Sequence, residues 1–132
     1  MAFRIAHVNP DPTPKARPKK EGAYLDFIRG LPCCITGRHG VEAAHLSFAA
    51  PRYGHYGRGK QHKASDRWAL PLCPEEHRIQ HSGSEAAYWM TTGINPHVLA
   101  LVLHGLWSEF GASAFPFAEA VIYQQIQGAR NA

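Results

Sequence analysis

The chain lacks the features that mark several common classes of protein. None of its apolar runs approaches the roughly 20 residues that a membrane-spanning helix needs, and its first residues do not resemble a secretory signal. Only three cysteines occur, two of them adjacent (Cys33 and Cys34), which is too few for a disulfide framework. We therefore expect a cytoplasmic protein without a membrane partner, with reduced thiols and a single domain in its 132 residues.

Basic residues are scarce in the second half of the chain. Of the 14 lysines and arginines, 12 lie in positions 1–67, whereas the remainder carries two arginines against five glutamates. This asymmetry favours one face that binds a polyanion, and DNA is the partner we expect. A basic surface that only contacts solvent would give the same distribution, so charge alone does not distinguish a DNA-binding face from a solvated one.

Residues 1–21 combine four prolines with Lys15, Arg17, Lys19 and Lys20. Such a composition does not form a packed core, and it predicts an extended or disordered basic arm. The arm could lie along phosphates or could serve as a solubilising tail. Residues 22–132 would then form one domain.

Hydrophobic periodicity and turn residues predict an α+β fold for this domain. Apolar side chains on one face predict a helix at 22–31, followed by a tight turn of the knuckle type at 33–37. Short apolar segments predict strands at 41–48 and 68–72. A short helix carrying His77 and His81 would come next, and further helices are predicted at 84–92, 95–110 and 115–127, with Ser84 and Asn95 as caps.

The segment 49–67 is rich in glycine and basic residues and has no hydrophobic periodicity, so it predicts a surface loop. Tyrosines are interleaved with the cations, and that pattern suits a nucleic-acid backbone because the cations neutralise phosphate while rings stack on bases. The candidate nucleic-acid-binding residues are Arg52, Arg58, Lys60, Lys63 and Arg67.

His77 and His81 are four residues apart, which places both imidazoles on one face of a helix, at a spacing that suits two ligands of one metal ion. Such a pair in isolation is more often a surface feature. A zinc peptidase would need a glutamate directly after the first histidine. Arg78 stands there, so that class of enzyme is excluded.

Several short motifs occur in an order that resembles the HNH endonucleases, in particular the small HNH proteins of phages and prophages. They are Ala43-Ala-His45-Leu46, Gly57-Arg-Gly-Lys60, Ser65-Asp-Arg-Trp68, Pro71-Leu-Cys73 and His77, and the similarity continues through Gln80-His-Ser82 and Gly93-Ile-Asn-Pro96. The resemblance covers about residues 30–107. It implies a ββα-metal (His-Me) finger at about 33–82, with a helical extension at 84–127.

The resemblance also implies the activity, which is metal-dependent hydrolysis of DNA phosphodiester bonds in double- or single-stranded DNA. His45 takes the role of general base, and His77 and His81 take the role of metal ligands. The single divalent ion could be Mg, Mn, Ni or Zn, and imidazole ligands favour a transition metal. The setting would be a bacterial or phage-infected cytosol.

Two departures from the family pattern leave alternatives open. Ala44 stands where these proteins usually carry a metal ligand, so the ion has fewer protein ligands, or His45 is itself a ligand, or Asp66 or His62 fills in. We expect Asp66 to be a catalytic residue, as a ligand or as the group that orients His45. Only the first cysteine of each expected zinc knuckle remains (Cys33 and Cys73), so no structural zinc is expected.

The remaining histidines and the aromatic residues have simpler interpretations. We expect surface or helix-face positions for His7, His39, His97 and His104, whereas His55 and His62 would contact phosphate or solvent. Aromatic residues at helical spacings predict core or an oligomer contact. A DNA- or RNA-binding module with a decayed or structural metal centre is the main alternative function, and a partner-docking protein is a third.

Overall fold

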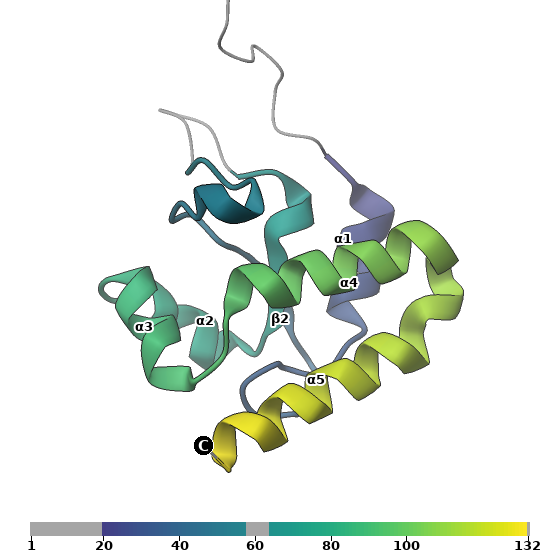
Figure 1. Cartoon of the computed structure of the whole chain (residues 1–132). Coiled ribbons are helices and arrows are strands. Elements are labelled where there is room, and N and C mark those ends of the chain that lie inside the picture. The colour runs from purple at the N-terminus through teal and green to yellow at the C-terminus, as the bar shows by residue number, and fades with distance from the viewer. Residues whose placement is uncertain (1–19, 58–63, 132) are drawn as a thin grey trace, which may run out of the picture.

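The structure is a computed structural model that describes residues 20–57 and 64–131. Within these ranges the fold is α+β, with five α-helices and one two-stranded antiparallel sheet (Figure 1). The helices are α1 (Gly22–Arg29), α2 (Pro74–His81), α3 (Glu85–Thr92), α4 (Pro96–Phe110) and α5 (Phe115–Arg130). Three 3-10 turns accompany them, η2 (Pro51–Tyr53), η3 (Asp66–Trp68) and η4 (Gly111–Ala114). The arm predicted for residues 1–21 lies almost entirely outside the described residues.

The two strands, β1 (Glu42–His45) and β2 (Ala69–Leu72), form a short ribbon. Its register pairs Glu42 with Leu72 at one end and His45 with Ala69 at the other. β1 is shorter than the predicted strand at 41–48. After Leu46 the backbone leaves the ribbon, because the N–H groups of Ser47 and Phe48 donate to the Glu85 carboxylate at 2.6 and 3.0 Å.

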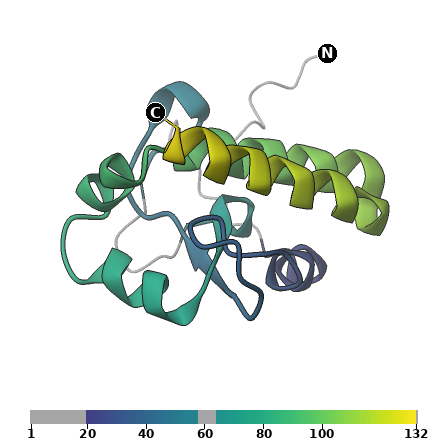
Figure 2. The same ribbon diagram turned by 90° about the horizontal axis from the view of Figure 1, so that it is seen from below.

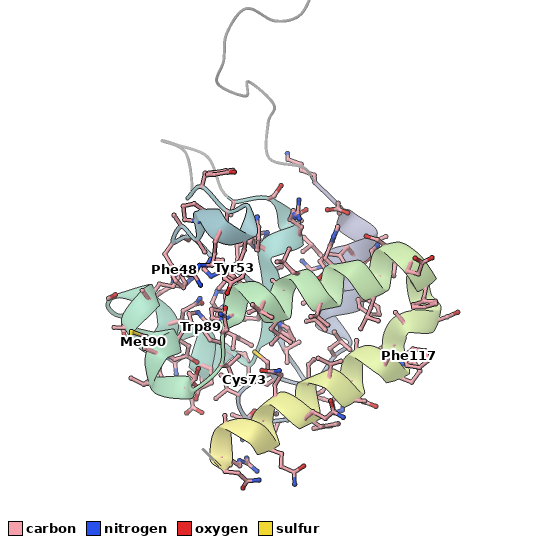
Figure 3. The ribbon with its side chains drawn as sticks, in the orientation of Figure 1. Phe48, Tyr53, Cys73, Trp89, Met90 and Phe117 are labelled. Atoms are coloured by element: carbon pink, nitrogen blue, oxygen red, sulfur yellow. The ribbon has the colours of Figure 1, made fainter. Side chains whose placement is uncertain are left out.

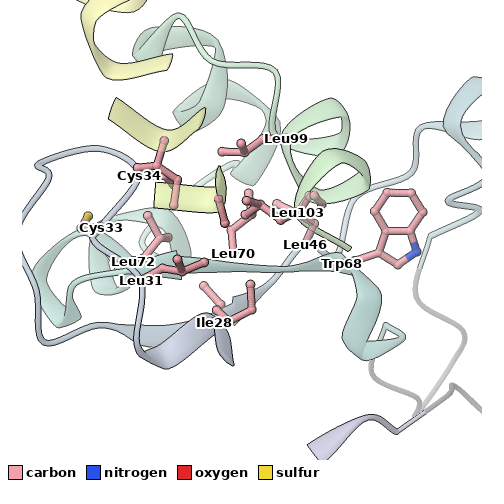
Figure 4. Packing of buried hydrophobic residues seen from close by; sticks show 14 of the residues in the cluster. Ile28, Leu31, Cys33, Cys34, Leu46, Trp68, Leu70, Leu72, Leu99 and Leu103 are labelled. Atoms are coloured by element: carbon pink, nitrogen blue, oxygen red, sulfur yellow. The ribbon is translucent and has the colours of Figure 1, made fainter. Parts of the chain in front are cut away.

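Helices cover both sides of the ribbon. Figure 2 shows α4 and α5 lying antiparallel as one layer, with the ribbon beneath them and α1 and α2 at its flanks. The core lies between these layers, where leucines of the ribbon region meet apolar side chains of α1 and α4 (Figure 4). The residues that meet there are Ile28, Leu31, Leu46, Leu70, Leu72, Leu99 and Leu103, none more than 2% exposed.

The predicted starts of two helices are confirmed. The Ser84 hydroxyl accepts a hydrogen bond from the Ala87 N–H, and the Asn95 amide oxygen accepts one from the Val98 N–H, each at 3.2 Å. Each cap satisfies a backbone donor that the first helical turn leaves without a partner. Gly93 ends α3 with a φ of 76°, a left-handed conformation that glycine adopts without strain. The path of the chain from α3 into α4 is therefore set by local sequence.

The knuckle turn predicted at 33–37 is also present. The Cys33 sulfur accepts the N–H groups of Ile35 and Thr36 at 3.4 and 3.5 Å, and the Gly37 N–H donates to the Cys33 carbonyl at 2.8 Å. Burial raises the pKa of the Cys33 thiol, but hydrogen bonds from Thr36, Cys73 and Ile35 outweigh this and leave it below its ordinary value. Cys33, Cys34 and Cys73 are all buried and free, so the thiols pack within the core.

The aromatic residues divide into core and surface. Trp89 is 1% exposed, and Tyr88, Trp107 and Phe115 pack against the core. Phe110 and Phe117 are 52% and 57% exposed, near the turn between α4 and α5, and Figure 3 shows Phe117 directed away from the fold. The prediction of a core role is confirmed for Trp89, Tyr88, Trp107 and Phe115.

The stretch 96–130 is long and apolar enough to cross a membrane by length and composition. The turn η4 divides it into helices of 15 and 16 residues, each shorter than the roughly 20 that a span needs. One such stretch is weak evidence for a membrane protein, and a soluble protein is compatible with it.

The core position of Leu103 leads to a stability prediction. Leu103→Ala should lower the free energy of unfolding by about 2–5 kcal/mol, because the side chain is fully buried and its loss leaves a cavity. Val102→Ala on the same helix is the control, since Val102 is 39% exposed and should change stability by less than about 1 kcal/mol. Urea unfolding followed by circular dichroism measures both, and equal losses would contradict the assignment of the α4 core face.

Candidate functional site

His45 and Asp66 form a hydrogen-bonded pair at one end of the ribbon. The imidazole Nε2 of His45 lies 2.8 Å from Oδ1 of Asp66, with side-chain exposures of 24% and 14%. The register places His45 at the last pair of the ribbon, and Asp66 begins the turn that leads into β2, so chain connectivity brings them together. An ionised carboxylate only accepts hydrogen bonds, and therefore Nε2 carries the proton and Nδ1 keeps its lone pair.

A second donor fixes the Asp66 carboxylate. Its Oδ2 accepts the backbone N–H of Glu21 at 2.7 Å, directly before α1. The Glu21 carboxylate in turn lies 3.1 and 3.2 Å from Nε2 of His104 on α4. Both oxygens of Asp66 are thus engaged, and the start of α1 is attached to the end of the ribbon that carries His45.

A pair of histidines lies on α2. Nε2 of His81 is 3.1 Å from Nε2 of His77, and Nδ1 of His77 is 2.8 Å from Oε1 of Glu42 on β1. The helix begins directly after β2, with Pro74 in its first turn and the acidic Glu75 and Glu76 near its positive N-terminus, as helix electrostatics favours. The first strand pair, Glu42 with Leu72, lies next to this start and so places the Glu42 carboxylate at His77.

The described residues contain no group of three or more His, Cys, Asp or Glu side chains that could hold a metal ion. That Asp66 joins His77 and His81 as a ligand therefore stays a prediction, whereas its hydrogen bond to His45 is the contact that its alternative role, orienting the base, requires. Asp66 precedes β2 and lies at the His45 end of the ribbon, whereas α2 follows β2 and lies at the Glu42 end. Ala44, at the position of the usual family ligand, is fully buried in the core.

The geometry of His77 and His81 nevertheless fits two ligands of a transition metal. Two imidazole nitrogens at about 2.0–2.1 Å from a tetrahedral ion are roughly 3.3 Å apart, close to the 3.1 Å between the two Nε2 atoms. His77 has its other nitrogen on a carboxylate, an arrangement common for metal-binding histidines. These residues would supply two coordination positions and leave the others to water or substrate.

The basic loop is described in part. Arg52 and Arg67 are exposed, with their guanidinium groups over the rings of Tyr53 and Trp68 at 5.8 and 5.2 Å. Arg58, Lys60 and Lys63, together with His62, lie outside the described residues. The segments that carry Arg52 and Arg67 lie at the same end of the molecule as the start of α1 (Figure 1).

Two histidines expected at the surface are buried. His55 is 2% exposed with Nε2 2.8 Å from the Leu46 carbonyl, and His97 is 3% exposed with Nε2 2.9 Å from the Phe48 carbonyl. They donate to the backbone where it leaves β1. The ring of Phe48 meets the His97 ring edge-on at 4.6 Å between centroids, and that of Tyr53 is stacked with it at 6.3 Å; Figure 3 shows Phe48 and Tyr53 next to each other. For His97, the spacing to Ala100 and Leu103 on the buried face of α4 could have indicated burial.

The arrangement defines an α+β protein in which an antiparallel ribbon and the following helix present one imidazole–carboxylate pair and one imidazole pair. The chain belongs to a family of proteins described as "Protein of unknown function (DUF968)", whose model matches residues 8–105. No curated protein and no solved structure matches the chain.

The burial of His97 leads to a prediction on pH. Burial is the largest cause that lowers its pKa below the ordinary value, and the neighbouring His55 adds to it. The unfolded chain then binds more protons than the folded one as pH falls, so the contribution of His97 to stability is present above about pH 6.5 and declines below it. We expect proton NMR to give a lowered pKa for His97.

The matched variant is His97→Gln, which can donate to the Phe48 carbonyl but does not titrate. It should reduce the loss of stability between pH 7 and 5 relative to the wild type, whereas His39→Gln at an exposed position should not. A His97 resonance that titrates at or above the ordinary value would contradict the prediction.

Proposed function

We propose that this protein is a metal-dependent endonuclease of the HNH type that hydrolyses DNA phosphodiester bonds with a ββα-metal finger formed by β1, β2 and α2. The observation that carries the proposal is the presence, at the two ends of one four-residue ribbon, of a carboxylate-bound imidazole at His45 and of two converging imidazole nitrogens at His77 and His81. The scissile phosphate would lie between them. A bacterial or phage-infected cytosol is the proposed setting.

His45 would be the general base. Asp66 holds the Nε2–H, so the lone pair on Nδ1 is free to take a proton from an attacking water. When Nδ1 gains that proton, the imidazole becomes a cation, and the adjacent carboxylate stabilises it. Because both Asp66 oxygens have donors, the imidazole keeps its orientation before substrate arrives.

His77 and His81 would hold the divalent ion through their Nε2 atoms. When bound, such an ion polarises a phosphate oxygen and stabilises the leaving 3′ oxygen. The two ligands are neutral, so the protein adds no ligand charge that would repel DNA phosphates. Imidazole ligands favour Mn, Ni or Zn over Mg.

Basic residues around the His45 end would bind the DNA backbone. Arg52 and Arg67 lie exposed there, and Arg58, Lys60 and Lys63 belong to the same segment of sequence. Tyr56, which is 81% exposed, offers a ring for a base of single-stranded DNA. This would explain why the basic residues are concentrated before position 68.

A non-catalytic nucleic-acid-binding module with a decayed metal centre is the second candidate. The observation that favours it is that no third protein ligand joins His77 and His81 among the described residues. Such a module would bind DNA with strong salt dependence but would not need the His45–Asp66 pair. Cleavage assays separate the two candidates.

The nuclease proposal predicts cleavage of plasmid or single-stranded DNA in the presence of Mg²⁺, Mn²⁺, Ni²⁺ or Zn²⁺, and its loss with EDTA. His45→Ala should reduce the rate by about 10²–10⁴-fold, the usual contribution of a general base. His39→Ala, at an exposed position, is the control and should cleave at the wild-type rate. Salt-sensitive DNA binding without cleavage under any of these ions would support the binding module instead.

Asp66→Asn should reduce the cleavage rate by about 10²-fold or more, because it reverses the tautomer of His45. The Glu21 N–H needs an acceptor, so the amide oxygen would turn to it and the amide N–H₂ would face Nε2 of His45. Nε2 would then accept, and the proton would move to Nδ1, where the base needs its lone pair. The cleavage rates of the wild type and the variant are compared under conditions in which both are fully folded. An unchanged rate would exclude a role of Asp66 in orienting the base.

A further inference from the structure

Glu42 is the charged residue nearest to the α2 histidines for which the proposed function has no role. Its Oε1 lies 2.8 Å from Nδ1 of His77, across 35 positions of sequence. Its side chain is 52% exposed and that of His77 is 23% exposed, so the contact lies at the edge of the fold. No core packing requires a carboxylate there.

The hydrogen bond determines which nitrogen of His77 carries a proton. A carboxylate accepts only, so Nδ1 of His77 must donate, and Nε2 of the neutral ring is left with its lone pair. That lone pair is directed at Nε2 of His81, 3.1 Å away. His81 then donates its own Nε2–H to His77 while no ion is bound.

The two histidines differ in how easily they become ligands. His81 is exposed, and its proton can move to Nδ1 with water as the partner, which frees Nε2. His77 needs no such change, because Glu42 has already placed its proton on Nδ1. The carboxylate also increases the electron density on the ring and strengthens Nε2 as a donor to a metal.

We propose that Glu42 is the positioning residue of the metal site, which holds His77 in the Nδ1–H form and thereby directs its Nε2 and that of His81 at one divalent ion. This inference rests on the proposed role of His77 and His81 as ligands. Glu42 does not coordinate the ion itself, since its oxygen occupies the opposite side of the His77 ring from the ligand nitrogen.

The test uses the full chain with Ni²⁺ alone as the probe. Glu42→Ala should weaken Ni²⁺ binding by about tenfold, the lower end of the effect of such carboxylates, because Glu42 is half exposed and water competes for the hydrogen bond. Glu42→Gln keeps an acceptor oxygen and should lose less. Glu75→Ala is the matched control, since it removes one exposed negative charge on α2 that pairs with Arg38 rather than with an imidazole. Isothermal titration calorimetry measures all four proteins.

A second readout does not depend on metal. Long-range proton–nitrogen NMR spectra of the metal-free protein should show His77 in the Nδ1–H form in the wild type and in Glu75→Ala. The Nε2–H form should appear in Glu42→Ala. Circular dichroism at 25 °C should be the same for each protein, which separates positioning from a loss of fold.

The outcomes distinguish this inference from the nuclease proposal. Unchanged Ni²⁺ affinity or an unchanged His77 tautomer in Glu42→Ala overturns the inference, even if the wild type cleaves DNA. A wild type that binds no Ni²⁺ overturns the inference, and it overturns the nuclease proposal only if DNA cleavage also fails with Mg²⁺, Mn²⁺ and Zn²⁺. The expected loss of affinity together with the tautomer change, in a protein that cleaves no DNA with any ion, supports the inference and rejects the nuclease.

Discussion

The register of the β1–β2 ribbon is the constraint on which the candidate site depends. Pairing His45 with Ala69 places the end of β1 against the turn that carries Asp66, and pairing Glu42 with Leu72 places the start of β1 against the helix that carries His77. A shift by one residue would turn every side chain of β1 to the other face, so it would bury His45 and expose Ala44. The apolar core beneath the ribbon opposes that shift, because Ala44, Leu70 and Leu72 are fully buried.

Polar side chains fix the backbone where the ribbon ends. The Glu85 carboxylate binds the N–H groups of Ser47 and Phe48, and His55 and His97 bind the carbonyls of Leu46 and Phe48. Three side chains from distant positions thus satisfy the donors and acceptors that a longer strand would have paired. Buried backbone groups without partners would cost about 1–3 kcal/mol each, so these contacts allow the chain to leave the sheet so close to the site.

Local sequence predicted the helices better than the loop between the strands. A helix start depends on neighbours three residues away, and so the local sequence is enough to identify Ser84 and Asn95 as caps. The burial of His55 and the contact of Glu42 with His77 depend on packing between different elements. The residue pattern within β1 or within the loop therefore could not predict either of them. The motif order placed His45, His77 and His81 on the ribbon and its helix. It left open whether Asp66 orients His45 or binds the metal, because the position of Asp66 relative to His45 depends on the register of the ribbon.

The Asp66 carboxylate has a further consequence through its two simultaneous donors. Because both oxygens of Asp66 are hydrogen-bonded, its side chain loses torsional freedom when the chain folds. The His45 ring, which is bonded to Asp66, loses its rotational freedom in the same step. The entropy cost of orienting the imidazole therefore belongs to folding and is not repeated at each encounter with a molecule from solution. The ribbon end is in this sense preorganised, and its order is linked to that of the first turn of α1.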